Sequence, residues 1–120
     1  RLCRVDGRGR STNLSDGILR LAPGEDGASL VQLGSPVQGS VERHPDGVAR
    51  VRIRMWPTAA TFPRGHRLRL QVSGGAHPLF ARNPGGGEPL GSATVLVPAD
   101  HEVFHDPTHP SAIELPHADW

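Results

Sequence analysis

Val-Ala-Arg-Val-Arg-Ile-Arg-Met-Trp at residues 48–56 alternates apolar and charged side chains one by one. Period two is the signature of a β-strand with one buried face, because a helix would scatter both kinds of side chain around its circumference. Arg-Leu-Arg-Leu-Gln-Val at 67–72 repeats the pattern. The apolar side chains of both segments are predicted to face a core: Val51, Ile53, Leu68 and Leu70.

Turn signals divide the rest of the chain. His-Pro-Asp-Gly at 44–47 predicts a β-hairpin across 36–56. Phe-Pro-Arg-Gly-His at 62–66 separates the two strongest strands. No apolar 3.6-residue repeat persists, so we expect no helix longer than a short turn. Further strands are predicted at 1–5, 17–22, 28–33, 36–43, 91–97, 100–105 and 111–115.

Short strands separated by frequent turns predict an all-β fold of two sheets, either a sandwich or a jelly roll. The 120 residues suit one domain, with no internal repeat and no linker long enough to split the chain. Two Trp, three Phe and no Tyr are present, so the core is expected to be mainly aliphatic.

Charge and cysteine content limit the partners and the compartment. Thirteen basic and twelve acidic residues nearly cancel, which gives no indication of a nucleic-acid or membrane partner. The single Cys3 excludes an internal disulfide and is predicted to be an inert core thiol. Neither a signal peptide nor an apolar run of about 20 residues is visible, so we predict a cytoplasmic location. A strand that begins at residue 1 without Met suggests a piece of a longer protein.

Four segments occur in an order that we can compare with a known family. They are Ser-Thr-Asn-Leu-Ser-Asp-Gly-Ile-Leu-Arg at 11–20, Phe-Pro-Arg-Gly-His-Arg-Leu-Arg-Leu-Gln-Val-Ser at 62–73, Ala-His-Pro-Leu-Phe-Ala-Arg-Asn-Pro at 76–84 and His-Asp-Pro-Thr-His-Pro-Ser-Ala-Ile-Glu-Leu-Pro at 105–116. Together they resemble the C-terminal domain of the cocaine esterase-type (CocE/NonD) hydrolases, relatives of Xaa-Pro dipeptidyl-peptidase. The resemblance covers residues 1–116.

The resemblance implies a jelly-roll (galactose-binding-like) β-sandwich that packs beside an α/β-hydrolase domain. It also implies that the first strands of the family's domain precede residue 1, which would leave apolar faces or sheet edges open. The family's catalytic Ser, Asp and His belong to the hydrolase domain, and no position here matches them. Residues 1–120 are therefore predicted to be a single C-terminal accessory domain without the catalytic domain.

The sequence offers little catalytic chemistry of its own. No serine has both glycines of the Gly-x-Ser-x-Gly elbow, so the chain alone is predicted to be inactive, although its parent would be a serine hydrolase. His101, His105 and His109 are spaced by four, but the prolines between and beside them disfavour a helix, and on a strand that spacing spans about 13 Å. We therefore predict no metal and no other cofactor, and expect His105 and Asp106 to tie down the last loop.

Several polar and aromatic residues are candidates for contacts. If the segments 48–56 and 67–72 pair, five arginines share one face: Arg50, Arg52, Arg54, Arg67 and Arg69. That face could be solvated, dock on an acidic surface of the parent enzyme or bind nucleic acid. Asn13 and Asp16 are expected to cap local backbone N–H groups, with a ligand role left open. Trp56 is interpreted as a core or interface anchor. The candidate interface or cleft-lining residues are Asn13, Asp16, Trp56, Arg67, Arg69 and His105.

The functional prediction is a non-catalytic C-terminal domain that supports the catalytic domain of a serine hydrolase and its substrate cleft. The hydrolase would be of the Xaa-Pro dipeptidyl-peptidase or ester hydrolase type. Two alternatives stay open: a carbohydrate- or ligand-binding β-sandwich module, and a homo-oligomeric scaffold that associates through exposed strands.

Overall fold

The computed structural model describes residues 1–21, 39–89 and 91–116. These residues form five strands and no helix: β1 (Leu2–Val5), β2 (Ser11–Ser15), β3 (Gly39–Arg43), β4 (Ala49–Ile53) and β5 (Arg67–Leu70). The strands make two antiparallel sheets, one in the order β2-β1-β5 and the other formed by β3 and β4. The predicted all-β class is confirmed, and the two sheets are consistent with a β-sandwich. The jelly-roll strand order stays a prediction.

The β3–β4 hairpin forms where the His-Pro-Asp-Gly signal predicts it. The amide of His44 donates to the carbonyl of Val48 at 2.8 Å, and the amide of Gly47 donates to the carbonyl of His44 at 3.0 Å. Gly47 has φ +87°, a left-handed conformation that costs glycine no steric strain. The turn fixes the register, with Val41 opposite Val51 and Gly39 opposite Ile53.

A second hairpin, β1–β2, is built in the same way and was not predicted. The amide of Asp6 donates to the carbonyl of Arg10 at 3.0 Å, and Gly9 has φ +82°. The Asp6 carboxylate accepts hydrogen bonds from the amides of Arg8 and Arg10, each at 2.9 Å. The sequence signal is Asp-Gly-Arg-Gly at 6–9, in which an Asx turn is followed by a glycine that takes a positive φ.

The sheet core lies on β1, which has a neighbour on each side. Leu2, Cys3 and Val5 are at most 5% exposed, and Ser15 of β2 is 6% exposed. The placement of Cys3 in a buried strand is confirmed. Residues opposite one another share a face, so Arg67 and Arg69 lie on the face of Val5 and Cys3, while Leu68 and Leu70 lie on the face of Arg4 and Leu2.

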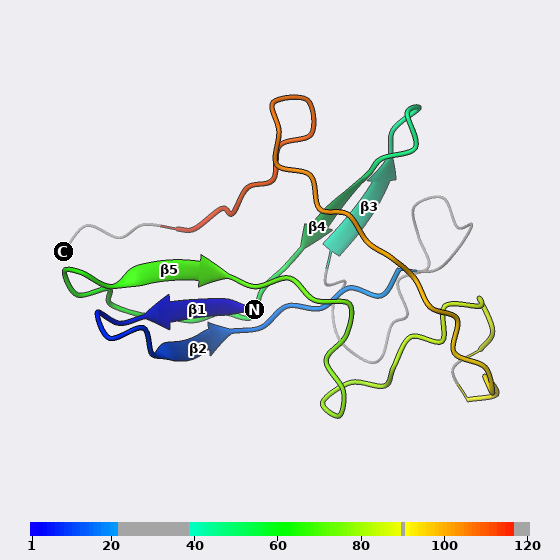
Figure 1. Cartoon of the computed structure of the whole chain (residues 1–120), viewed down its shortest axis with the longest axis horizontal. Helices are drawn as coiled ribbons and strands as arrows, with labels where there is room; N and C mark the ends of the chain where they lie inside the picture. Colours follow the sequence, from blue (N-terminus) through cyan, green and yellow to red (C-terminus); the bar gives the residue numbers. More distant parts are fainter. Residues whose placement is uncertain (22–38, 90, 117–120) are drawn as a thin grey trace.

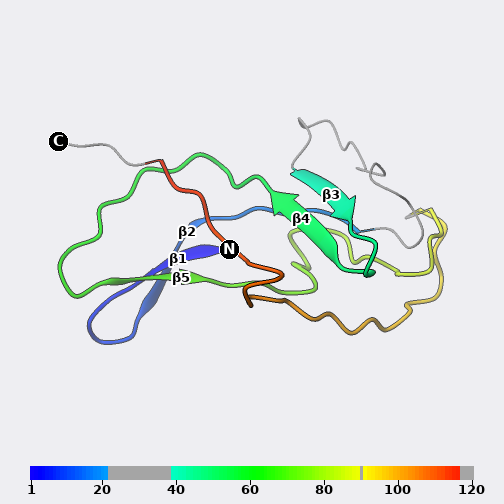
Figure 2. The same cartoon turned by 90° about the horizontal axis from the view of Figure 1, so that it is seen from above.

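The segment after β4 joins the two sheets and then returns to β5. Figures 1 and 2 show the β3–β4 hairpin set to one side of the three-stranded sheet. Ser15 Oγ donates to the carbonyl of Trp56 at 2.6 Å, and the Trp56 amide donates to the carbonyl of Asp16 at 2.9 Å. Farther along, Arg4 Nη1 donates to the carbonyl of Thr61 at 3.0 Å. Gly17 sits at this junction, where the backbones approach closely.

The burial predicted for the strongest strands is wrong. Val51, Ile53, Leu68 and Leu70 are between 36% and 48% exposed. Their side chains alternate with arginines as expected, but nothing in the described part of the chain covers their apolar faces fully. The radius of gyration of 16.5 Å agrees, since about 14 Å is typical of a compact domain of this length.

Several strand boundaries also differ from the prediction. Residues 17–21, 91–97, 100–105 and 111–115 form no strand, and β2 was missed. The predicted strand 28–33, residue 22 of the strand 17–22 and residues 36–38 of the strand 36–43 lie outside the described residues. Val-Leu-Val at 95–97 and Val-Phe at 103–104 have high β propensity, but propensity gives a strand only where a neighbouring strand is available to pair.

Replacing Gly17 by Ala is expected to lower the free energy of unfolding by about 1–3 kcal/mol, because there is no room for the added methyl group. A Cβ at this position would lie 2.8 Å from the carbonyl oxygen of Arg54 and 3.0 Å from Cγ2 of Ile53. Gly75→Ala is the matched control, because a Cβ there meets nothing within 4 Å. Urea unfolding of both variants measures the difference, and equal stabilities would contradict the close packing of the junction.

Candidate interaction surface

Three of the predicted contact residues come together at the junction between the sheets. Asn13 Nδ2 donates to Asp16 Oδ2 at 2.7 Å, and Arg1 Nε donates to Asp16 Oδ1 at 2.9 Å. These two hydrogen bonds hold the pKa of Asp16 below its ordinary value, and the bond from Arg1 has the larger effect. The backbone of Trp56 is bonded to Asp16 and Ser15, as described above. The predicted local capping by Asn13 and Asp16 is therefore wrong, because their side chains bond to one another and to Arg1.

Trp56 is fixed by its backbone while its indole faces outward. Its side chain is not a core anchor, because the residue is 51% exposed. Pro57 follows and has no backbone N–H to donate, so the chain cannot resume a strand ladder at this point, beyond the end of β4 at Ile53. An interface role for Trp56 stays a prediction.

The predicted single row of arginines does not form. Strands β4 and β5 belong to different sheets, since β4 pairs with β3 and β5 pairs with β1. Arg50, Arg52 and Arg54 are therefore separated from Arg67 and Arg69. The pairing on which that row depended is absent because β5 pairs with β1 at the start of the chain, and no local turn signals such a distant pair.

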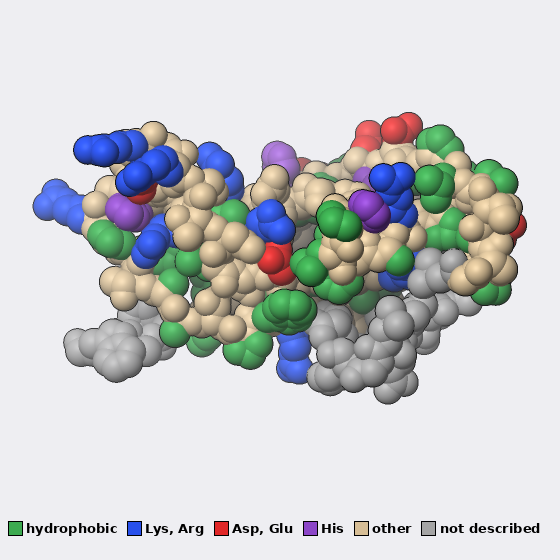
Figure 3. Space-filling view, turned by 90° about the horizontal axis from the view of Figure 1, so that it is seen from below, with side chains coloured by type: hydrophobic (Ala, Val, Ile, Leu, Met, Phe, Trp, Pro, Cys, Tyr) green, Lys and Arg blue, Asp and Glu red, His purple; other side chains and the backbone are tan. Residues whose placement is uncertain are grey.

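Exposed apolar side chains are a prominent feature of the described surface. Exposed aliphatic side chains occur on both sheets and after β5, and apolar groups are visible over much of the face drawn in Figure 3. The exposed side chains on or beside the strands are Val51, Ile53, Trp56, Phe62, Leu68, Leu70 and Val72. Large exposed apolar surfaces in a soluble chain mark sites of contact with other protein.

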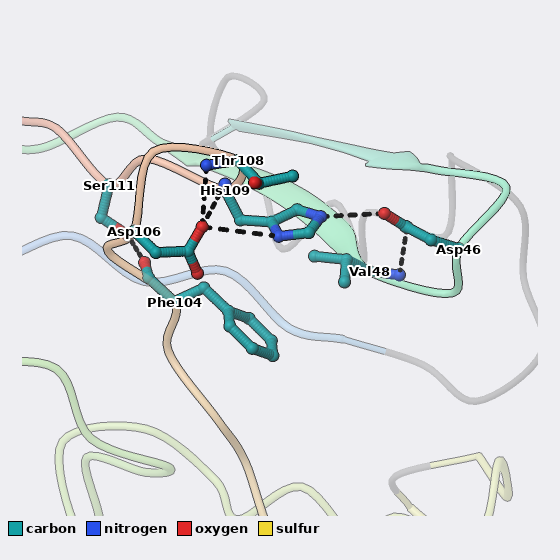
Figure 4. Close-up of polar contacts among 7 residues, drawn as sticks. All are labelled: Asp46, Val48, Phe104, Asp106, Thr108, His109 and Ser111. Atoms are coloured by element: carbon teal, nitrogen blue, oxygen red, sulfur yellow. Dashed lines mark hydrogen bonds and ion pairs between the residues drawn. The ribbon is translucent and has the colours of Figure 1, made fainter.

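The last loop is tied down by His109 and not by His105. His109 Nε2 lies 2.8 Å from Asp46 Oδ2 in the β3–β4 turn, and its ring packs at 5.5 Å against Phe104 (Figure 4). Asp106 Oδ1 accepts hydrogen bonds from the amides of Thr108 and His109 at 2.8 and 2.9 Å. The expected role of Asp106 is confirmed, whereas His105 is exposed and makes no hydrogen bond or ion pair within the described residues.

The contacts of the last loop lower the pKa of two carboxyl groups, those of Asp46 and Asp106. The hydrogen bond from His109, followed by that from the Val48 amide, holds the pKa of Asp46 below its ordinary value. The amides of His109 and Thr108 lower the pKa of Asp106 in the same sense. The contacts of this loop therefore favour the ionised form of both carboxyl groups. The His-Pro-Asp-Gly and Asp-Pro-Thr-His motifs each predict a turn, but no feature of the sequence indicates that the two turns are in contact.

No constellation for catalysis or metal binding emerges from the described residues. They contain no group of three or more His, Cys, Asp or Glu side chains that could hold a metal ion. These residues form no helix, and hence none that is long and apolar enough to cross a membrane. What the surface offers instead is contact area, apolar on the strand faces and basic around the arginines.

Comparison with known proteins assigns this fold to a family. Residues 1–114 match the family of the X-Pro dipeptidyl-peptidase C-terminal non-catalytic domain. The chain therefore belongs to this family of non-catalytic C-terminal domains. It is also similar to a cocaine esterase from Rhodococcus sp. (strain MB1 Bresler), with 30% identity over 112 residues. The match covers 90% of this chain and 17% of the esterase, so the chain spans about a sixth of that relative. No solved structure matches it.

Replacing Asp46 by Asn is expected to reduce the acid sensitivity of the chain. The pKa of Asp46 is lowered from 3.8 by folding, so its ionised form stabilises the folded state above that pH, and this stabilisation is lost as the pH falls through the folded pKa. Unfolding measured from neutral pH to below 3.8 should therefore show a smaller loss in Asp46→Asn than in the wild-type chain.

Asp100→Asn is the matched control, because Asp100 is exposed and has no bonded partner among the described residues. Its pH profile should follow that of the wild-type chain. Superimposable profiles for the wild-type chain and Asp46→Asn would contradict the bond between Asp46 and His109.

Proposed function

We propose that this chain is a supporting domain of a serine hydrolase of the Xaa-Pro dipeptidyl-peptidase or ester hydrolase type. In this role it packs its apolar strand faces against the catalytic α/β-hydrolase domain and forms part of the wall of the substrate cleft. The proposal is supported by membership of a non-catalytic C-terminal domain family and by similarity to a cocaine esterase.

The observation that carries the proposal is the exposure of side chains whose pattern is that of a core. Val51 and Ile53 alternate with Arg50 and Arg52, so one face of β4 is apolar and the other charged. A strand that faced water on both sides would need no such alternation. Covering one half-exposed aliphatic side chain contributes about 1 kcal/mol, so a few of them suffice for a stable domain interface.

The junction of the sheets is a second feature suited to a domain boundary. Trp56 projects from a backbone that is fixed by Ser15 and Asp16. A large aromatic side chain on a rigid support is a favourable anchor, because little conformational entropy is lost when it becomes buried. Asn13 and Asp16 lie beside it and would form the polar rim of the same contact.

The isolated chain is expected not to hydrolyse aryl esters or Xaa-Pro chromogenic amides, because it lacks the nucleophile elbow. Turnover is measured on the purified chain before and after treatment with a serine-directed fluorophosphonate. Activity that the fluorophosphonate abolishes would contradict a purely supporting role.

Polar substitution of the apolar faces should weaken the interface more than the domain itself. Ile53→Ser and Leu68→Ser are expected to change the unfolding free energy of the isolated chain by less than about 1 kcal/mol, since both residues are half exposed. In the hydrolase that carries the domain, the same variants should lower the melting temperature and the activity. Val5→Ala is the contrasting control. Val5 is buried, so this substitution should destabilise both the isolated chain and the hydrolase that carries the domain.

Self-association is a second candidate, favoured by the same exposed faces. It would cover Ile53 and Leu68 with a second copy of the chain. Analytical ultracentrifugation of the isolated chain distinguishes the candidates: a dimer that Ile53→Ser dissociates supports self-association, and a monomer at high concentration excludes it.

A further inference from the structure

Two turns that are far apart in the sequence lie side by side at one end of the three-stranded sheet. Val5 of β1 is opposite Ser11 of β2 and also opposite Arg67 of β5. The turn at 6–10 and the turn at 63–66 therefore both leave the sheet at the Val5 end, and Figures 1 and 2 show both loops there.

This end carries four arginines, Arg8, Arg10, Arg64 and Arg67, which we call the arginine end. All four are exposed, and basic side chains are gathered there in the space-filling view (Figure 3). Every basic side chain among the thirteen in this protein is an arginine, since the sequence contains no lysine. Arginine presents a planar fork that binds carboxylates through two parallel hydrogen bonds.

Within the described residues, the Asp6 carboxylate at this end is already bonded to its own turn. Asp6 Oδ1 accepts from the amides of Arg8 and Arg10, and Asp6 Oδ2 accepts from Arg10 Nε at 2.7 Å. The guanidinium groups of Arg8, Arg64 and Arg67 make no hydrogen bond or ion pair with any residue of 1–21, 39–89 or 91–116. Three cationic forks therefore remain available for a partner.

The backbone that presents these arginines is held in hydrogen-bonded turns. Gly9 and Gly65 have φ +82° and +84°, and the amide of His66 donates to the carbonyl of Pro63 at 3.0 Å. Tight turns that are bonded to a sheet keep the arginine Cα positions fixed before binding. This reduces the ordering cost of a contact.

We propose that the arginine end binds a carboxylate-rich protein surface. Nucleic acid is the weaker alternative, because four charges on a chain of net charge +1 would neutralise few phosphates. The proposal goes beyond the apolar contact argued above, because it concerns a different part of the three-stranded sheet and a partner selected by charge. It does not depend on the identity of the domain that covers Ile53 and Leu68.

The test is binding of a short fluorescent poly-L-glutamate to the purified chain at low ionic strength, where exposed charges are least screened. Arg64→Glu/Arg67→Glu should weaken binding about tenfold or more, because each reversal removes an attraction and adds a repulsion. The matched control is Arg52→Glu/Arg54→Glu, which makes the same charge change on and beside β4. It should leave the affinity nearly unchanged, and circular dichroism should be the same for both double variants.

Three outcomes would overturn the proposal. The wild-type chain could fail to bind poly-L-glutamate, or both double variants could lose binding equally, which would indicate attraction to net charge alone. A short DNA duplex could also bind more tightly than poly-L-glutamate in the same buffer, which would assign the arginine end to nucleic acid.

Discussion

The burial of β1 is the constraint on which the rest of the structure depends. Leu2, Cys3 and Val5 are the apolar residues that the described sheets bury, and β1 is the strand that holds both β2 and β5 in place. The hydrophobic contribution of three such side chains is small compared with the entropy of ordering the residues that the structure describes. The described part of the domain is therefore organised around one strand, and many of its other large apolar side chains are exposed.

Different parts of the described surface expose different kinds of side chain. The apolar faces of β4 and β5 suit a partner that supplies aliphatic contact, whereas the turns at 6–10 and 63–66 suit a partner that supplies carboxylates. Between the sheets, Ser15 and Asp16 bind the backbone of Trp56 and so keep the two parts connected.

The sequence predicted what is local and missed what depends on distant contacts. The alternation at 48–56 and the His-Pro-Asp-Gly turn were enough to place the β3–β4 hairpin, because both signals lie within a few residues. The pairing of β5 with β1 was missed, since it joins residues that no turn connects. Burial was overestimated for the same reason: period two says which face is apolar, but not what covers it. Likewise, the motif at 105–109 marked an anchored loop without showing that His109, and not His105, would reach Asp46.

Amide hydrogen exchange tests the central claim most directly, because it reports local stability strand by strand. It should be measured on this chain alone and on the chain joined to the hydrolase domain. The account predicts that β1 is protected in both forms, whereas β4 and β5 become strongly protected only when the hydrolase domain is present. Equal and strong protection of β4 and β5 in the isolated chain would contradict it, because those strands would then need no other protein to cover them.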